Sequence, residues 1–122
     1  MPRRILVVED VQDLRDLVRL VFVSQGHSIR VACDGIEAVE AVREERFDAI
    51  IMDAEMPNLN GWDATRLIRG MPNGRNVPVM LYTSHTGPQL ETRVKEVGAN
   101  GLLEKSVLPK EMLPSVMQLI KR

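Results

Sequence analysis

The most informative segment of this sequence runs Ala49-Ile50-Ile51-Met52-Asp53-Ala54-Glu55-Met56-Pro57-Asn58-Leu59-Asn60-Gly61. Its first four residues form a continuous apolar run, which is typical of a parallel strand covered on both faces. The run ends on the carboxylate of Asp53, and Met56-Pro57-Asn58 follows almost at once. The segment therefore predicts a buried strand with an acidic side chain at its carboxyl end.

Similar apolar runs occur on both sides of this segment and alternate with stretches of helical period. Strands are predicted at residues 4–9, 28–33, 48–53, 78–83 and 101–104. Amphipathic stretches follow each of them, and the first repeats its apolar residues at i, i+3, i+4, i+7 and i+8. That stripe consists of Leu14, Leu17, Val18, Val21 and Phe22. The alternation predicts an α/β fold, a doubly wound (βα)5 parallel five-stranded sheet with right-handed crossovers.

Local signals mark the ends of several predicted helices. Asp34 at the N-cap and Glu37 three residues later resemble a capping box. Pro114 falls inside the last amphipathic stretch, so that helix either begins later or has Pro114 in its first turn. Residues 70–77, rich in Gly, Pro and Asn, are expected to form a longer surface loop.

Length and composition limit the classes of protein to be considered. The 122 residues suit a single domain spanning 1–122, and 44% hydrophobic with 27% charged residues permits an ordinary core. The formal net charge of -1 gives no basic field for nucleic acid. No apolar run approaches the length of a membrane span, and a single cysteine, Cys33, excludes an internal disulfide. These features fit the cytoplasm.

Acidic side chains follow two of the predicted strands. Glu9 and Asp10 come after the first apolar run, and Asp53 closes the third. Because the carboxyl ends of parallel strands meet at one edge of the sheet, we expect these carboxylates to converge. Like charges in such proximity require a cation, and oxygen ligands favour Mg²⁺, with Mn²⁺ as an alternative. The plainer interpretation is that each acid caps a helix or faces solvent.

Two further side chains follow the last two strands. Thr83 ends the fourth, where it is either a hydroxyl donor to a phosphoryl oxygen or a helix cap. Lys105 follows the fifth, where its ammonium either pairs with Asp53 and a phosphoryl group or is simply solvated. Asp53 is then the candidate nucleophile, because carboxylates can form aspartyl phosphates.

Four segments together carry a resemblance to a known family. They are Val7-Val8-Glu9-Asp10, residues 53–61, Val79-Met80-Leu81-Tyr82-Thr83-Ser84, and Gly98-Ala99-Asn100-Gly101-Leu102-Leu103-Glu104-Lys105. With this spacing the chain resembles the receiver domain of two-component response regulators over nearly its whole length. The resemblance implies a flavodoxin-like sheet of order 2-1-3-4-5. It also implies a phosphorylation-dependent signalling switch rather than an enzyme acting on outside substrates.

The resemblance assigns the metal site and the phosphoacceptor by position. Asp53 would accept the phosphoryl group from a histidine kinase or a small phosphodonor. Asp10 and Asp53 would bind Mg²⁺ directly, Glu9 would help through water, and the backbone carbonyl of Glu55 would complete the protein ligands.

The remaining roles concern the phosphoryl group and the response to it. Thr83 and Lys105 would contact the phosphoryl oxygens, and Thr83 with Leu102 would mark the switch on the face formed by the fourth helix, fifth strand and fifth helix. Glu55 and Ser84 would tune the lifetime of the phosphorylated state. We also expect that Glu55 can reach Lys105 in the unphosphorylated protein.

Three positions depart from the family pattern. Leu102 stands where the family often has Tyr or Phe, which puts aromatic gating in question. Ser106 replaces the usual proline after Lys105, so either a trans bond with a reshaped loop or a strained cis bond is expected. Val11 replaces an acid often found there.

The resemblance also implies partners. They are a sensor histidine kinase or phosphotransfer protein, an effector on the output side, and a second copy in a phosphorylation-dependent dimer, with neither nucleic acid nor membrane bound by this domain. The chain either works alone or forms the front part of a longer regulator. Two alternatives stay open: an aspartate-nucleophile phosphatase with Glu55 as general acid, and a receiver-like module that binds partners without phosphate.

Overall fold

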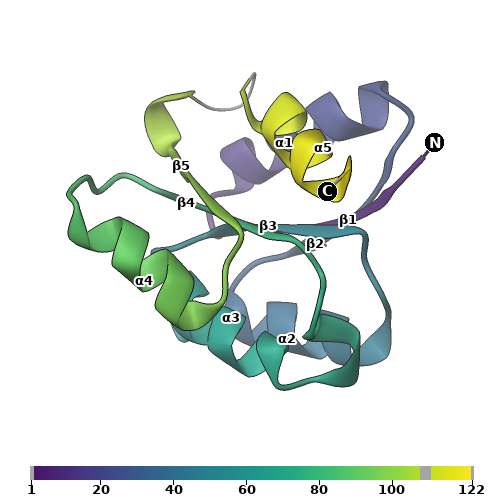
Figure 1. Cartoon of the computed structure of the whole chain (residues 1–122). Coiled ribbons are helices and arrows are strands. Elements are labelled where there is room, and N and C mark those ends of the chain that lie inside the picture. Colours follow the sequence, from purple (N-terminus) through teal and green to yellow (C-terminus); the bar gives the residue numbers. More distant parts are fainter. Residues whose placement is uncertain (1, 108–110, 122) are drawn as a thin grey trace.

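The computed structural model describes residues 2–107 and 111–121, and in these residues five strands form one parallel sheet. The strand order is β2-β1-β3-β4-β5 (Figure 1). The order and the element alternation agree with the predicted doubly wound fold. The strands are β1 Arg4–Val8, β2 Ser28–Ala32, β3 Ala49–Asp53, β4 Val79–Thr83 and β5 Gly101–Glu104.

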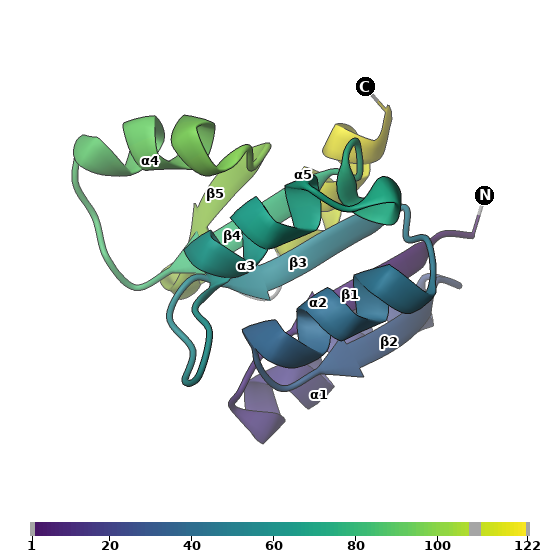
Figure 2. The same cartoon turned by 90° about the horizontal axis from the view of Figure 1, so that it is seen from below.

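Helices cover both faces of the sheet. They are α1 Gln12–Ser24, α2 Gly35–Glu44, α3 Gly61–Arg69, α4 Gln89–Val97 and α5 Met112–Lys121. Helices α1 and α5 lie on one face, and α2, α3 and α4 lie on the other (Figures 1 and 2). None of these helices has the length and apolarity that a membrane crossing requires.

Side chains of each strand alternate between two apolar clusters, as the strand period requires. Ile51 of β3 and Met80 of β4 pack with residues of α1 and α5, whereas Ile50 and Leu81 pack with residues of α2, α3 and α4. This alternation matters for function, because it fixes which face each side chain at the carboxyl end of a strand will join.

The structure confirms the predicted N-cap of α2, and it defines the position of Pro114 and the conformation of residues 70–77. Asp34 caps α2 by accepting the Glu37 N–H at 2.9 Å. Pro114 is the third residue of α5, in the first turn, where no intrahelical donor is missing. The expected loop at 70–77 contains a short 3-10 helix, Pro72–Gly74, and Gly74 is buried against Ile68.

Candidate functional site

Three carboxylates converge at the carboxyl edge of the sheet. Glu9 follows β1 and Asp53 ends β3, so both continue the alternation on the α1 and α5 face, and Asp10 comes next in the chain. One oxygen of each of Glu9, Asp10 and Asp53 lies within 4.8 Å of the others. Glu9 and Asp53 are 0% exposed, while Asp10 faces solvent. The topology thus brings the three predicted acids together.

Both oxygens of Glu9 are engaged. Oε1 accepts the Tyr82 hydroxyl at 2.6 Å, and Oε2 accepts the Val11 N–H at 2.9 Å. Burial raises the pKa of Glu9 from 4.5 to about 7, although these two hydrogen bonds lower it, and the charge of Asp53 adds to the rise. The burial of Glu9 therefore favours a bound cation or proton nearby.

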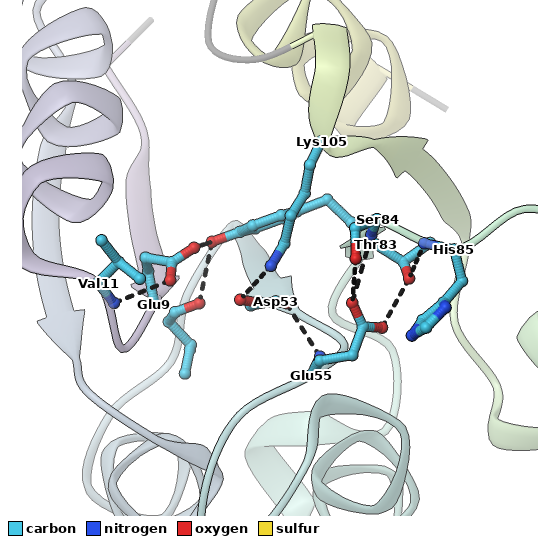
Figure 3. Close-up of polar contacts among 10 residues, drawn as sticks. Glu9, Val11, Asp53, Glu55, Thr83, Ser84, His85 and Lys105 are labelled. Carbon is cyan, nitrogen blue, oxygen red and sulfur yellow. Dashed lines mark hydrogen bonds and ion pairs between the residues drawn. The ribbon is translucent and has the colours of Figure 1, made fainter.

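Asp53 is oriented through both of its oxygens. Oδ1 accepts the Glu55 N–H at 2.9 Å, and the Lys105 ammonium lies 2.9 Å from Oδ2 (Figure 3). Among the described residues Oδ2 has no hydrogen-bond partner of good geometry, so the ion pair is its sole polar contact. Burial raises the pKa of Asp53, and Lys105 and the Glu55 N–H lower it. Although burial lowers the pKa of Lys105, its close pairing with the Asp53 carboxylate raises it overall.

This arrangement fits a hard divalent cation. Three carboxylates lie together, the Lys105 ammonium pairs with Asp53, two of the carboxylates are fully buried, and the cluster offers oxygen ligands alone. Buried like charges raise one another's free energy until a cation compensates them. Magnesium retains several waters and is held by one or two carboxylates, so this cluster supplies enough ligands.

Thr83 and Ser84 lie on the other side of Asp53, where they contact Glu55. The Thr83 hydroxyl donates to Glu55 Oε2 at 2.6 Å, and Glu55 Oε1 accepts the Ser84 N–H at 3.3 Å (Figure 3). The expected Glu55 contact with Lys105 is wrong for this state, since no ion pair joins them within 4.0 Å and Lys105 pairs with Asp53 instead. By strand alternation Thr83 points to the α4 side, which explains its partner.

A cavity of about 700 Å³ opens on this same side, between the segment after β3 and the start of α4. Glu55, Thr83 and Trp62 line it, and Trp62 is otherwise buried in the core beneath the Arg93 guanidinium, 4.5 Å from the ring centroid. Thr83 and Glu55 therefore border open space, whereas Glu9 and Asp53 are enclosed.

Two predicted residues lie away from the acids, and one polar residue was overlooked. Leu102 is half-buried in β5 and packs toward the α4 side, opposite Leu81. Ser106 follows in a short 3-10 helix, Lys105–Val107, and its peptide isomer stays a prediction. The sequence pattern indicates only a strand position for Tyr82 and does not predict its contact with Glu9. Its signal was the presence of the chain's single phenol inside an apolar strand, directly before Thr83.

Known proteins share both this sequence pattern and this geometry. A sequence profile described as the response regulator receiver domain matches residues 5–117. The receiver domain of sensor histidine kinase PA1611 from Pseudomonas aeruginosa superposes with a TM-score of 0.89 and 31% identity, covering 100% of both chains. That structure was described with a magnesium ion coordinated in its active site cleft. Vibrio cholerae CheY4 superposes with a TM-score of 0.91 and 28% identity, covering 98% of this chain and 99% of that one.

Curated relatives are longer than this chain. Response regulator MprA of Mycobacterium tuberculosis is 31% identical over 122 residues, which are 100% of this chain and 52% of MprA. The Vibrio cholerae CAI-1 autoinducer sensor kinase/phosphatase CqsS is 36% identical over 104 residues, 84% of this chain and 15% of CqsS. The chain thus spans about half of one relative and a small part of the other. With the fold, the acid cluster and the profile in agreement, this chain belongs to the response regulator receiver domains, a family of two-component signalling modules rather than catalytic enzymes.

Proposed function

We propose that this domain is a phosphorylation-dependent switch that accepts a phosphoryl group on Asp53. The observation that carries the proposal is the buried Asp53 carboxylate, with Lys105 2.9 Å from Oδ2 and the Glu9 and Asp10 carboxylates beside it. A carboxylate oxygen of Asp53 attacks the phosphorus, and the bond from phosphorus to the histidine nitrogen or acyl oxygen of the donor breaks. An aspartyl phosphate results.

Mg²⁺ fits as the cofactor, with Mn²⁺ as an alternative. Asp10, Asp53 and the Glu55 backbone carbonyl would hold it directly, and Glu9 would hold it through water. When bound, the ion supplies positive charge that neutralises the acids and the incoming phosphoryl oxygens. The chain's own share is to fix Asp53 through the Glu55 N–H and to present the Lys105 ammonium to a phosphoryl oxygen.

Thr83 carries the signal in this proposal. Its hydroxyl donates to Glu55 while Asp53 is unmodified, and it would turn to a phosphoryl oxygen once Asp53 is phosphorylated. That movement would change the face formed by α4, β5 and α5, where Leu102 lies half-buried. An effector would read this face, and a sensor histidine kinase or phosphotransfer protein, in the cytoplasm, would supply the phosphoryl group.

The test is phosphorylation by acetyl phosphate in the presence of Mg²⁺, followed by intact-mass measurement. Wild type is expected to gain one phosphoryl group, and Asp53→Asn none, because an amide is not a nucleophile toward phosphorus. Omission of Mg²⁺ should abolish the gain. Labelling that persists in Asp53→Asn would move the acceptor elsewhere. No labelling of wild type would favour a module that binds partners without phosphate.

A further inference from the structure

Tyr82 lies directly beneath the acid cluster. It is the only tyrosine of the chain, it is 0% exposed, and it is opposite Asp53 in the pairing of β3 with β4. Paired residues of neighbouring strands point to the same face of a sheet, so the Tyr82 side chain joins Asp53 on the α1 and α5 face. The core around it is otherwise apolar, and a buried hydroxyl in such a place needs a partner.

That partner is Glu9. The hydroxyl lies 2.6 Å from Glu9 Oε1 and 3.3 Å from the Val8 carbonyl oxygen. A phenol has one proton to donate, and the shorter contact to the acid is the stronger bond. Since the Val11 N–H takes Oε2, the carboxylate has one donor on each oxygen, and its rotation is restricted.

The ring of Tyr82 lies near the Lys105 ammonium. Lys105 Nζ lies 6.0 Å from the ring centroid, at the outer limit of a cation–π contact, and 2.9 Å from Asp53 Oδ2. One side chain thus touches the acid through its hydroxyl and borders the ammonium through its face. Tyr82 therefore contacts both Glu9 and Lys105, the two charged neighbours of Asp53.

We infer that Tyr82 is a positioning residue for the divalent cation: its hydroxyl holds the Glu9 carboxylate turned toward Asp10 and Asp53. The inference depends on the cation site of the proposed function. Without the hydroxyl, Glu9 Oε1 would be a buried acceptor with no donor, and the carboxylate would turn to find another. The group of three oxygens would then lose its spacing.

The test is calorimetric titration of the full chain with Mg²⁺, wild type against Tyr82→Phe. Removal of a partner of a direct metal ligand typically weakens metal affinity by about 10- to 100-fold, and because Glu9 would hold the ion through water we expect a loss at the lower end, about 10-fold. Phosphorylation by acetyl phosphate gives the second readout. The Mg²⁺ concentration for half-maximal rate should rise by more than the maximal rate falls, which general damage to the fold would not produce.

Two controls separate positioning from the loss of a buried hydroxyl as such. Thr65→Val removes a buried bond of similar length, from Thr65 Oγ1 to the Gly61 carbonyl at 2.7 Å, and should leave Mg²⁺ affinity unchanged. Because Tyr82 acts through Glu9, adding Tyr82→Phe to Glu9→Gln should change Mg²⁺ affinity less than twofold. A full additional loss in that background would overturn the inference.

A third measurement uses the wild-type protein alone, so its result cannot come from an effect of a substitution on the fold. The NMR signals of the single tyrosine ring should shift during Mg²⁺ titration. The Mg²⁺ concentration at the midpoint of this shift should equal the midpoint measured by calorimetry. Unshifted signals, or equal Mg²⁺ affinity of wild type and Tyr82→Phe, would overturn the role of Tyr82 and leave the cation site standing. Absence of Mg²⁺ binding by wild type would overturn both the role and the site.

Discussion

The Thr83 hydroxyl donates a hydrogen bond to Glu55 Oε2 across 2.6 Å, and the same Oγ1 accepts the His85 N–H at 3.1 Å. The single proton of the Thr83 hydroxyl is therefore committed to Glu55 in the unphosphorylated domain. A phosphoryl group on Asp53 would have to win that proton from a carboxylate. Glu55 is thus a competitor for the switch residue as well as a neighbour of the acceptor.

Replacement of Glu55 by Ala should make phosphorylation more favourable. The substitution removes the carboxylate that accepts the Thr83 hydrogen bond, and it removes a negative charge that repels the negatively charged phosphodonor. A hydrogen bond to a charged group contributes about 1.5–3 kcal/mol, which corresponds to roughly a 10- to 100-fold rise in phosphorylation rate if the whole bond opposes phosphorylation. Acetyl phosphate time courses followed by intact mass measure the rise, and the dephosphorylation rate should change as well.

Ser84→Ala is the matched control, because the Ser84 hydroxyl lies 3.5 Å from Glu55 Oε1 and its loss leaves the Thr83 bond intact. Its phosphorylation rate should stay within about twofold of wild type, as expected for a weak contact. Equal rates for wild type and Glu55→Ala would show that Glu55 does not restrain Thr83.

Much of the fold could be predicted from the sequence, because the central strands are continuous apolar runs. The run at 49–52 is apolar throughout, which is typical of a strand covered on both faces, and its alternation with helical stretches indicates a parallel sheet with helices on either side. Convergence of Glu9 and Asp53 then followed from topology alone. Strand ends shifted by one residue in several cases, since pairing ends where the backbone leaves the sheet.

The partners of the site residues could not be read in the same way. Strand alternation turns Thr83 to the α4 side, where it bonds to Glu55, whereas Lys105 begins the short 3-10 helix after β5 and pairs with Asp53. Tyr82 and Glu9 are 73 residues apart, and their bond depends on the register of three strands and on two side-chain rotamers. These hydrogen-bond partners depend on tertiary packing, which local sequence patterns do not predict.

Stability without divalent cation should fall as the pH rises from 5 to 8. Glu9 has an ordinary pKa of 4.5 in the unfolded chain and about 7 in the folded one, so the folded state binds the extra proton between these values. The contribution is complete below pH 4.5 and is lost as the pH passes 7. The difference corresponds to about 3 kcal/mol at most, and the raised pKa of Asp53 acts in the same direction.

Urea unfolding in EDTA across this pH range measures the loss, and Glu9→Gln should flatten the curve because it carries no titrating carboxyl. Saturating Mg²⁺ should raise the stability of wild type most at pH 8, where Glu9 is ionised. A stability that is level from pH 5 to 8 in EDTA, or identical in Glu9→Gln, would contradict the assigned burial effect.

A methyl group at Gly61 should disturb the site through the backbone. A Cβ there would lie 2.3 Å from the Asp53 carbonyl oxygen and 2.9 Å from Ala54 Cα, and neither backbone atom can turn aside as a side chain would. Gly61→Ala should cost about 1–3 kcal/mol of unfolding free energy, as overpacking does. It should also weaken Mg²⁺ binding, because the segment that carries Asp53 has to move.

Gly70→Ala provides the comparison, since its Cβ would meet the Leu67 carbonyl at an ordinary 3.5 Å and its φ of -84 suits any residue. That variant should match wild type or gain about 0.4–1 kcal/mol from a less flexible unfolded chain. Chemical denaturation of both variants decides the matter, and equal stabilities would show that the close approach at Gly61 is relieved without cost.

Arg69 should be a structural residue whose loss affects stability far from the acids. Its guanidinium donates to the carbonyls of Gly98, Gly74 and Val77 at 2.8, 2.8 and 2.6 Å, and to Asn100 Oδ1 at 2.8 Å. One side chain thereby ties the end of α3 to the segments before β4 and β5. Arg69→Met should remove the donor from the three carbonyls, while Asn100 Oδ1 keeps the Val79 N–H, and it should cost about 2–4 kcal/mol, since hydrogen bonds to charged groups contribute about 1.5–3 kcal/mol each before any water replaces them.

Arg66→Met, on the exposed side of the same helix, should change stability by less than about 0.5 kcal/mol. Arg69→Lys should behave like Arg69→Met and not like wild type, because an ammonium cannot reach acceptors on both sides of a planar guanidinium at once. Rescue by Lys would mean that charge alone is needed at this position. Failure of Lys together with retained Mg²⁺ affinity would place the role of Arg69 in the scaffold that holds β4 and β5 in register.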